Sequence, residues 1–152
     1  MEISKKGSVA VIGGGVIGGG WVARFLLNGL DVHIHDPNPE AGRRIREVMV
    51  NAERAWDNLT SAPLPEKGSL SFCGTIAEAV EDAFFIEECI PENLELKQQI
   101  YAEIEQKASS NALIGSSTSG LLPSDLQAEL QNPERLLVTH PFNPVYLLPL
   151  VE

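Results

Sequence analysis

Six short runs of apolar and β-branched residues recur along the chain, and most of them are nearly continuous rather than alternating. They lie at residues 9–12, 32–35, 70–73, 84–87, 113–116 and 136–139. Continuous apolar runs are typical of strands that are covered on both faces. The pattern therefore predicts six strands in a buried sheet.

Between these runs, apolar residues repeat every three to four positions, as they do on one face of a helix. Three such segments lie at residues 17–26, 45–52 and 96–104. Asn-Gly at 28–29 marks a helix end, and Asp-Pro-Asn-Pro at 36–39 marks a helix start. This alternation predicts an α/β fold of Rossmann type. We expect a doubly wound, mainly parallel sheet with right-handed crossovers and helices on both faces.

The composition fits one globular domain over residues 1–152, with 43% hydrophobic and 21% charged residues. Residues 60–69 contain two prolines and a glycine and are expected to form a surface loop rather than a domain linker. The formal net charge of −10 would be repelled by phosphate backbones and anionic lipid surfaces. We therefore expect neither nucleic acid nor membrane as a partner.

The same composition bears on the cellular compartment. No apolar run approaches the roughly 18–20 residues of a membrane span, and the first ten residues lack the pattern of a secretory signal. The two cysteines, Cys73 and Cys89, have neither the spacing of a zinc site nor that of a disulfide framework. We expect a cytoplasmic protein without a bound metal.

A glycine-rich turn follows the first predicted strand and opens the first predicted helix. Gly13, Gly15 and Gly18 form the pattern G-x-G-x-x-G. The first glycine permits a tight turn, the second lets a pyrophosphate approach the backbone, and the third lets the helix pack on the strand. The helix dipole favours the negative pyrophosphate at this end. The predicted cofactor loop is Gly13, Gly14, Gly15, Val16, Ile17 and Gly18.

Asp36 ends the second predicted strand, 18 residues after Gly18. That spacing is close to the value of about 20 for the acidic residue that accepts hydrogen bonds from the adenosine ribose. A carboxylate there would repel a 2′-phosphate, so the expected cofactor is NAD rather than NADP. The alternative is a glycine-rich turn in which Asp36 merely caps the next helix.

His140 directly follows the last predicted strand, where open α/β sheets place their ligands. Glu152 lies 12 residues further on, across a segment long enough to double back. A histidine oriented by a carboxylate is a common general base near neutral pH. A histidine satisfied within a turn remains an equal alternative. His33 and His35 are interpreted as ordinary strand positions.

Four segments in order carry a resemblance. They are the glycine-rich start, Ile-Pro-Glu-Asn-Leu at 90–94, Ser-Ser-Thr-Ser at 116–119 and His-Pro-Phe-Asn-Pro at 140–144. Together they resemble the N-terminal, NAD-binding domain of the L-3-hydroxyacyl-CoA dehydrogenase family over essentially the whole chain. The resemblance implies an NAD-dependent oxidoreductase that oxidises a 3-hydroxy acid to the 3-oxo acid.

The resemblance also implies roles for individual residues. His140 matches the catalytic base, and Glu152 matches the carboxylate that orients it. Ser119 matches the serine that hydrogen-bonds the reacting oxygen, and Asn143 matches the asparagine beside the same site.

Two further positions match the nicotinamide half of the cofactor site. These are Glu92 and Lys97. Without the resemblance, the first would be interpreted as a charge near a helix N-terminus and the second as a solvated lysine. The resemblance further implies a C-terminal helical domain for substrate binding and homodimer formation, which this chain does not contain.

Within the family, residues 116–124 and 140–152 are most similar to the branch that oxidises L-carnitine. The branch that oxidises L-gulonate, with its relative lambda-crystallin, is next. Residues 51–69 contain only Arg54 and Lys67 as basic residues, where the acyl-CoA branch is rich in lysine. Coenzyme A is therefore a less favoured substrate than a small 3-hydroxy acid.

Carnitine carries a quaternary ammonium group, which aromatic faces bind. Trp56, Phe142 and Tyr146 are candidates for that contact, with ordinary core positions as the alternative. A non-catalytic NAD-binding or crystallin-like structural protein is the alternative from another class. The intact set of Ser119, His140, Asn143 and Glu152 argues against it, because a structural chain has no need of all four.

Overall fold

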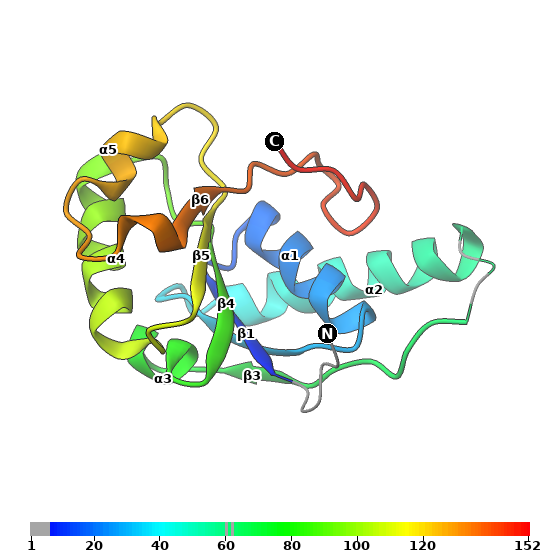
Figure 1. Ribbon diagram of the computed structural model, residues 1–152. Helices are drawn as coiled ribbons and strands as arrows, with labels where there is room; N and C mark the ends of the chain where they lie inside the picture. Colours follow the sequence, from blue (N-terminus) through cyan, green and yellow to red (C-terminus); the bar gives the residue numbers. More distant parts are fainter. Residues whose placement is uncertain (1–6, 60, 62) are drawn as a thin grey trace.

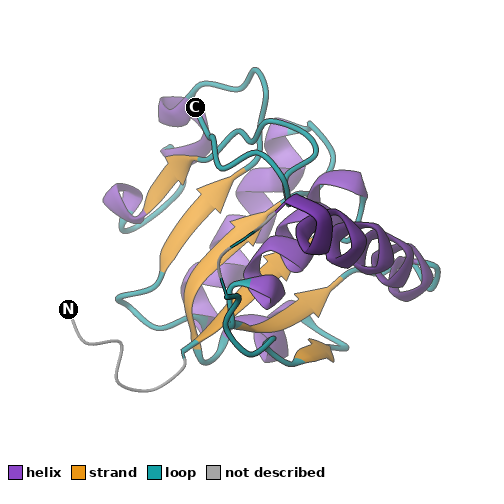
Figure 2. Ribbon diagram, turned by 90° about the vertical axis from the view of Figure 1, so that its right-hand side faces the viewer, coloured by secondary structure: helices purple, strands orange, loops and turns teal. Residues whose placement is uncertain are grey.

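The computed structural model describes residues 7–59, 61 and 63–152, and six parallel strands form one sheet between two helical layers (Figures 1 and 2). The sheet order is β3-β2-β1-β4-β5-β6. All six predicted strands are confirmed to within one residue at each end. Their bounds are β1 (Ser8–Ile12), β2 (Asp31–His35), β3 (Leu70–Phe72), β4 (Ala83–Glu88), β5 (Leu113–Ser116) and β6 (Leu136–Val138).

Helices cover both faces of the sheet, as expected for a doubly wound fold (Figure 1). The first face carries α1 (Val16–Leu27) and α2 (Ala41–Leu59), and the second carries α3 (Ile76–Val80), α4 (Leu94–Lys107) and α5 (Pro123–Gln127). A 3₁₀ turn, η1 (Pro133–Arg135), leads into β6. The three helices predicted from periodicity are α1, α2 and α4, and the fold class is confirmed.

The two short helices were not predicted, because five residues are too few to establish a 3.6-residue period. For α3, capping was the available signal. Thr75 accepts a hydrogen bond from the backbone N–H of Glu78, and the Glu78 carboxylate accepts one from that of Gly74. A threonine followed three residues later by glutamate is typical of a helix start.

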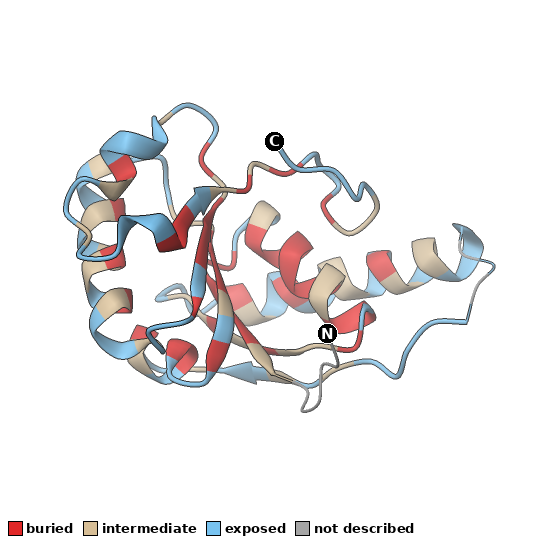
Figure 3. Cartoon of the chain, viewed as in Figure 1, coloured by how far each residue is buried: buried red, intermediate tan, exposed pale blue. Residues whose placement is uncertain are grey.

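Two apolar cores lie on opposite sides of the sheet (Figure 3). On the side of α1 and α2, Val9, Val11, Val32 and Ile34 pack against Trp21, Val22, Leu26 and Ile45. On the other side, Ala10, Ile12, Ile86 and Ile114 pack against Ile76, Tyr101, Ile104 and Leu126. Neighbouring strand residues thus face opposite cores, which is why the strand sequences are apolar throughout.

The predicted surface loop at residues 60–69 is confirmed for 61 and 63–69, which have no helix or strand up to Leu70. Thr60 and Ala62 lie outside the described residues. Asn28 forms the C-cap of α1 and Gly29 adopts φ 81°, so the predicted helix end at 28–29 is also confirmed. Within the described part of the chain, no helix is long and apolar enough to cross a membrane.

Helix α1 approaches the end of β1 very closely at one glycine. A Cβ atom on Gly18 would lie 1.8 Å from the carbonyl oxygen of Gly13, which is far inside contact distance. A Cβ atom on Gly15 would meet no atom within 4 Å. Gly15 and Gly18 therefore differ in purpose, since of these two motif glycines only Gly18 is required by the packing of the fold.

We expect Gly18→Ala to lower the free energy of unfolding by about 1–3 kcal/mol or more, because the helix must move away from β1. The matched Gly15→Ala variant should stay within about 0.5 kcal/mol of the parent, since its methyl group points into open space. Urea denaturation of the three proteins tests the difference. Equal stability of the two variants would contradict the close approach at Gly18.

Candidate cofactor and catalytic site

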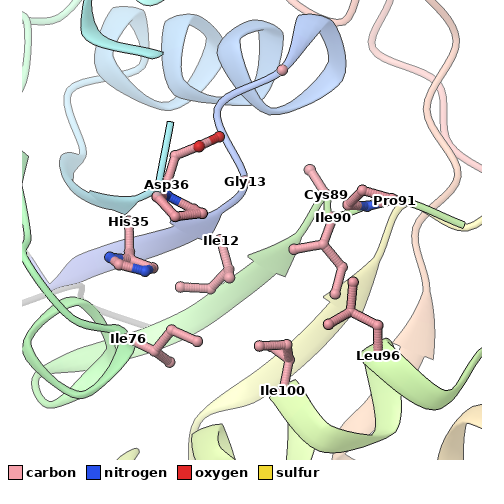
Figure 4. Close-up of a pocket in the computed structure, with 12 residues that line it drawn as sticks. Ile12, Gly13, His35, Asp36, Ile76, Cys89, Ile90, Pro91, Leu96 and Ile100 are labelled. Atoms are coloured by element: carbon pink, nitrogen blue, oxygen red, sulfur yellow. The ribbon is translucent and has the colours of Figure 1, made fainter. Parts of the chain in front are cut away.

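A cavity of about 570 Å³ opens at the carboxyl ends of β1, β2 and β4 (Figure 4). In this strand order the chain adds β2 and β3 on one side of β1 and β4, β5 and β6 on the other. Ligands of such sheets bind in the crevice at the carboxyl ends of the strands where this reversal occurs, here between β1 and β4. The glycine-rich loop and Asp36 form one side of the cavity. The other side is apolar, with Ile12, Ile76, Ile90, Leu96 and Ile100. Such walls suit a flat, uncharged ring.

The glycine-rich loop is shaped for a group that approaches its backbone. Gly13 adopts φ 102°, which strains other residues, and its N–H donates to the carbonyl of His35 over 2.9 Å. A Cβ atom there would lie 2.6 Å from the carbonyl oxygen of Cys89. Gly15 precedes α1 and has open space in front of it. The loop thus fits a pyrophosphate at the helix N-terminus.

Asp36 links the loop to the segment that leads into α2. Its Oδ2 accepts a hydrogen bond from the N–H of Gly14 over 2.5 Å, and its Oδ1 accepts one from the N–H of Asn38 over 2.7 Å. Helix α2 begins at Ala41, so Asp36 does not cap it. A carboxylate has about four acceptor positions, which leaves two for ribose hydroxyls at the rim of the cavity.

His140, Ser119 and Glu152 lie together just beyond β5 and β6. The His140 Nε2 lies 3.2 Å from Ser119 Oγ, and its Nδ1 lies 3.4 Å from Glu152 Oε1. The backbones of His140 and Glu152 also exchange two hydrogen bonds of 3.0 Å, and Pro141 bridges to Val151. The chain doubles back after His140 as predicted. One ring nitrogen of the imidazole, Nε2, faces Ser119, and the other, Nδ1, faces Glu152.

Asn143 is exposed in the same returning segment, and its peptide bond to Pro144 is cis. Glu92 lies before α4, and its Oε1 accepts hydrogen bonds from the Thr118 hydroxyl and from the backbone N–H of Ser119 and Gly120. Partial burial raises the pKa of Glu92, but these hydrogen bonds outweigh it and the pKa is lowered. Glu92 therefore holds the Ser119 turn.

Lys97 is buried, with a side chain only 1% exposed, so its interpretation as a solvated lysine is wrong. Its Nζ lies 2.6 Å from Glu88 Oε1 and 3.7 Å from Glu92 Oε2, inside the layer between β4 and α4. Neither Lys97 nor Glu92 belongs to the lining of the 570 Å³ cavity, although their neighbours Leu96 and Pro91 do. The structure thus places Lys97 in the buried layer, while the side chain of Glu92 is 43% exposed beside the Ser119 turn.

Sequence reasoning missed a buried polar network around Glu88, at the end of β4. Its carboxylate accepts hydrogen bonds from the hydroxyls of Tyr101 and Ser116, and from the N–H of Ile90 over 2.7 Å. Burial and the charge of Glu88 raise the pKa of Tyr101 well above its usual value, so the phenol keeps its proton. The signal in the sequence was a pair of glutamates at the end of an otherwise apolar strand.

Glu87, the other member of that pair, lies on the opposite side of the sheet and is also fully buried. It accepts hydrogen bonds from the hydroxyls of Ser117 and Thr139. Burial raises its pKa from 4.5 to about 8, although these two hydrogen bonds act in the other direction. At neutral pH the group therefore holds a proton for most of the time.

Two of the three aromatic residues considered for cation binding, Trp56 and Tyr146, make structural contacts instead. The Trp56 indole N–H donates to the carbonyl of Tyr146 over 2.6 Å, and both side chains pack against Ala23, Leu27 and Ala52. They join the C-terminal segment to α1 and α2, which supports the alternative of core positions. Phe142 is 39% exposed, so of the three candidates it has the most accessible ring.

Comparisons with known proteins bear on this geometry. The domain described as "3-hydroxyacyl-CoA dehydrogenase, NAD binding domain" matches residues 8–152. A Rhizobium protein named L-carnitine dehydrogenase/betainyl-CoA thioesterase is 65% identical over 143 residues, which are 94% of this chain and 29% of that protein. L-carnitine dehydrogenase of Mesorhizobium japonicum is 60% identical over 153 residues, which are 100% of this chain and 42% of that protein.

A solved structure supports the fold independently. The NAD⁺-dependent dismutase 5-formyl-3-hydroxy-2-methylpyridine 4-carboxylic acid 5-dehydrogenase superposes with a TM-score of 0.87 at 34% identity. The superposition covers 97% of this chain and 48% of that one. The chain therefore spans less than half the length of the relatives and of the solved structure described here.

The buried Glu87 should make stability depend on pH. Between about pH 4.5 and 8 the folded protein holds a proton that the unfolded chain releases, so stability falls as pH rises through this window. Glu87→Gln cannot titrate at this position. The difference between its free energy of unfolding and that of the parent should therefore shift in favour of the variant as the pH increases. Urea denaturation at a series of pH values measures the difference.

The exposed Glu103 on α4 offers a matched control. Glu103→Gln should leave the pH dependence of the parent unchanged, because this side chain is exposed to water and not buried like that of Glu87. If the free energies of unfolding of Glu87→Gln and the parent changed equally with pH, Glu87 would ionise normally in the folded protein, and the prediction would be wrong.

Proposed function

The chain belongs to the 3-hydroxyacyl-CoA dehydrogenase family, as its NAD-binding domain, and from this we propose that the protein oxidises a 3-hydroxy acid to the 3-oxo acid. L-Carnitine, giving 3-dehydrocarnitine, is the first candidate substrate. One observation carries the proposal: Ser119, His140 and Glu152 lie together at the carboxyl ends of the strands, as the cofactor cavity does. NAD supplies the acceptor for the hydride that leaves the carbinol carbon.

The residues of this chain handle the proton. With Nδ1 facing the Glu152 carboxylate, the neutral imidazole of His140 carries its proton on Nδ1 and leaves Nε2 free to accept. Nε2 takes the proton of the substrate hydroxyl as the carbon–oxygen double bond forms. The Ser119 hydroxyl, 3.2 Å from Nε2, reaches the same oxygen and donates to it. Asn143 is proposed to contact the substrate beside them.

The cofactor contacts follow from the cavity. The loop from Gly13 to Gly18 would hold the pyrophosphate, Asp36 the adenosine ribose, and the apolar wall the adenine. Glu92 and Lys97 are proposed to border the nicotinamide half. Glu92 accepts the N–H of Ser119, and the Lys97 ammonium lies 3.7 Å from the Glu92 carboxylate, so both support the Ser119 turn.

The choice of L-carnitine is supported by the relatives that bear this substrate in their names. In residues 51–69, the sole lysine, Lys67, is paired with Glu53 at 2.6 Å, so no lysine there is free to bind a coenzyme A phosphate. The net charge of −10 also suits a cationic head group better than a polyphosphate. L-3-Hydroxyacyl-CoA and L-gulonate are the alternative substrates.

A non-catalytic or crystallin-like protein is the alternative of another class. The imidazole with a carboxylate on one nitrogen and a hydroxyl on the other favours an enzyme. We further propose that the complete protein is a cytoplasmic homodimer that acts on small molecules rather than on nucleic acid or membranes. Two free cysteines, Cys73 and Cys89, are consistent with a reducing compartment.

A substrate panel tests the proposed function. The complete protein in which this chain occurs is given NAD and L-carnitine, L-gulonate or 3-hydroxybutyryl-CoA, and NADH formation is followed by absorbance. We expect the highest kcat/KM for L-carnitine. A higher value for the acyl-CoA would contradict the substrate assignment, and no NADH with any of the three would contradict the dehydrogenase.

Cofactor choice is tested at Asp36. NAD should bind at least about tenfold more tightly than NADP, because a 2′-phosphate would meet a carboxylate. Asp36→Asn should narrow this preference, because the charge is lost and the single amide oxygen can accept only one of the two hydrogen bonds from Gly14 and Asn38. Calorimetry with both cofactors measures the ratio, and equal affinities in the parent would overturn the assignment of Asp36.

His140 is tested by removing its imidazole. His140→Ala should lower kcat by a factor of about 10²–10⁴, the usual contribution of a positioned general base, and leave NAD affinity within about twofold. His33→Gln, in the middle of β2, is the matched control and should retain turnover. A loss of less than tenfold in the first variant would exclude His140 as the base.

A further inference from the structure

Glu87 is a fully buried carboxyl group that the proposed chemistry leaves unused. Its Oε1 accepts hydrogen bonds from Ser117 Oγ over 2.6 Å and from Thr139 Oγ1 over 2.8 Å. The same Ser117 hydroxyl accepts a hydrogen bond from the indole N–H of Trp21 in α1 over 3.1 Å. One oxygen of Glu87 therefore joins three parts of the molecule: β4, the turn after β5 and the residue after β6.

The bridge crosses a neighbouring strand. β5 lies between β4 and β6, and Gly115 is the β5 residue opposite Glu87. A Cβ atom on Gly115 would lie 2.5 Å from Glu87 Oε2 and 2.6 Å from Thr139 Oγ1. Any side chain there would occupy the space of the bridge. The glycine thus opens a window through which a side chain on β4 reaches one that follows β6.

Both segments that the bridge joins carry proposed catalytic groups. Ser117 precedes Ser119 by two residues, and Thr139 directly precedes His140. The backbone ladder between these segments ends where Thr139 N–H meets the Ser116 carbonyl over 2.8 Å. Beyond that point the strands no longer fix the separation of Ser119 and His140, and the Glu87 contacts lie at this end.

We propose that Glu87 is a positioning residue that sets the separation of the Ser119 hydroxyl and the His140 imidazole by bridging Ser117 and Thr139 through the window at Gly115. The inference rests on the proposed function of Ser119 and His140. It adds that their geometry is determined from β4, on the α1 side of the sheet, by a group that touches neither substrate nor cofactor.

Two kinds of variant distinguish this role from simple core filling. In Glu87→Gln the amide oxygen replaces Oε1, which accepts both hydroxyls, so the bridge is retained. The amide nitrogen replaces Oε2, which lies 3.0 Å from Thr139 Oγ1, and it can donate to that hydroxyl. Glu87→Leu fills a similar volume and removes the bridge. Thr139→Val removes only the hydroxyl that Thr139 contributes to the bridge. It tests the proposal even if Glu87→Leu does not fold.

The first readout is the imidazole of His140 in this chain, observed by ¹⁵N NMR. With three histidines in the sequence, a His140→Gln sample assigns its signals. We expect the parent and Glu87→Gln to show one tautomer, with the proton on Nδ1 toward Glu152. Glu87→Leu and Thr139→Val should keep this tautomer, because Glu152 still faces Nδ1. Their Nε2 signal should shift, because Ser119 Oγ no longer holds its separation of 3.2 Å from Nε2.

The second readout is turnover of the complete protein with NAD and L-carnitine. Glu87→Leu and Thr139→Val should lower kcat about tenfold to a hundredfold, the cost of misplacing a reacting group by roughly 1 Å, with KM and NAD affinity within about threefold. Glu87→Gln should keep kcat within about threefold. Arg135→Met, which removes buried hydrogen bonds to Ser109 and Ala112 at the other end of the sheet, is the stability-matched control with unchanged kcat.

The outcomes separate the two proposals. An unchanged Nε2 signal of His140 in folded Glu87→Leu and Thr139→Val overturns the positioning role, whatever the protein catalyses. An equal loss of kcat in Arg135→Met would also overturn it, since the effect would then be general destabilisation. A shifted Nε2 signal in these variants of a protein that oxidises none of the three substrates would support the bridge while the proposed function fails.

Discussion

The end of β4 carries two adjacent carboxyl groups in the protein interior, and the arrangement of the functional loops depends on them. Taking a carboxylate and an ammonium out of water costs several kcal/mol for each ion, and a buried pair is tolerated only with good geometry and further hydrogen bonds. Glu88 meets that condition with Lys97, Tyr101, Ser116 and the N–H of Ile90. The segment after β4 is thereby fixed to β5 and α4.

The same strand end serves the cofactor cavity and the catalytic group at once. Successive residues of a strand face opposite sides, so Glu88 binds Ser116, the last residue of β5, from the α4 side. Glu87 binds Ser117, the next residue, from the α1 side. Glu92, four residues after Glu88, accepts hydrogen bonds from the backbone N–H groups of Ser119 and Gly120. Ile90 and Pro91, between these carboxyl groups, form part of the cavity wall. The cofactor cavity and Ser119 are thus built on one short segment.

The C-terminal segment is held by tertiary contacts rather than by regular structure. Val145 packs against α1 where a Cβ atom on Gly20 would come within 2.9 Å, which explains a glycine beyond the cofactor motif. Arg24 donates to the carbonyl of Val145 over 3.1 Å, and Trp56 donates to that of Tyr146. These contacts return the chain so that Glu152 meets His140. Helices α1 and α2 therefore support the catalytic group as well as the cofactor loop.

The sequence alone predicts the six strands, the three long helices and the glycine-rich loop, because these follow from local periodicity and from a motif whose members are close in the chain. It offers the pairing of His140 with Glu152 only beside an equal alternative, a histidine satisfied within a turn. It did not reveal that Lys97 is buried, that Glu87 and Glu88 face opposite sides of the sheet, or that Trp56 and Tyr146 bind each other. Each of these depends on which distant residue lies opposite. Burial of a charge is decided by partners on other strands and helices, and only the tertiary structure brings those partners together.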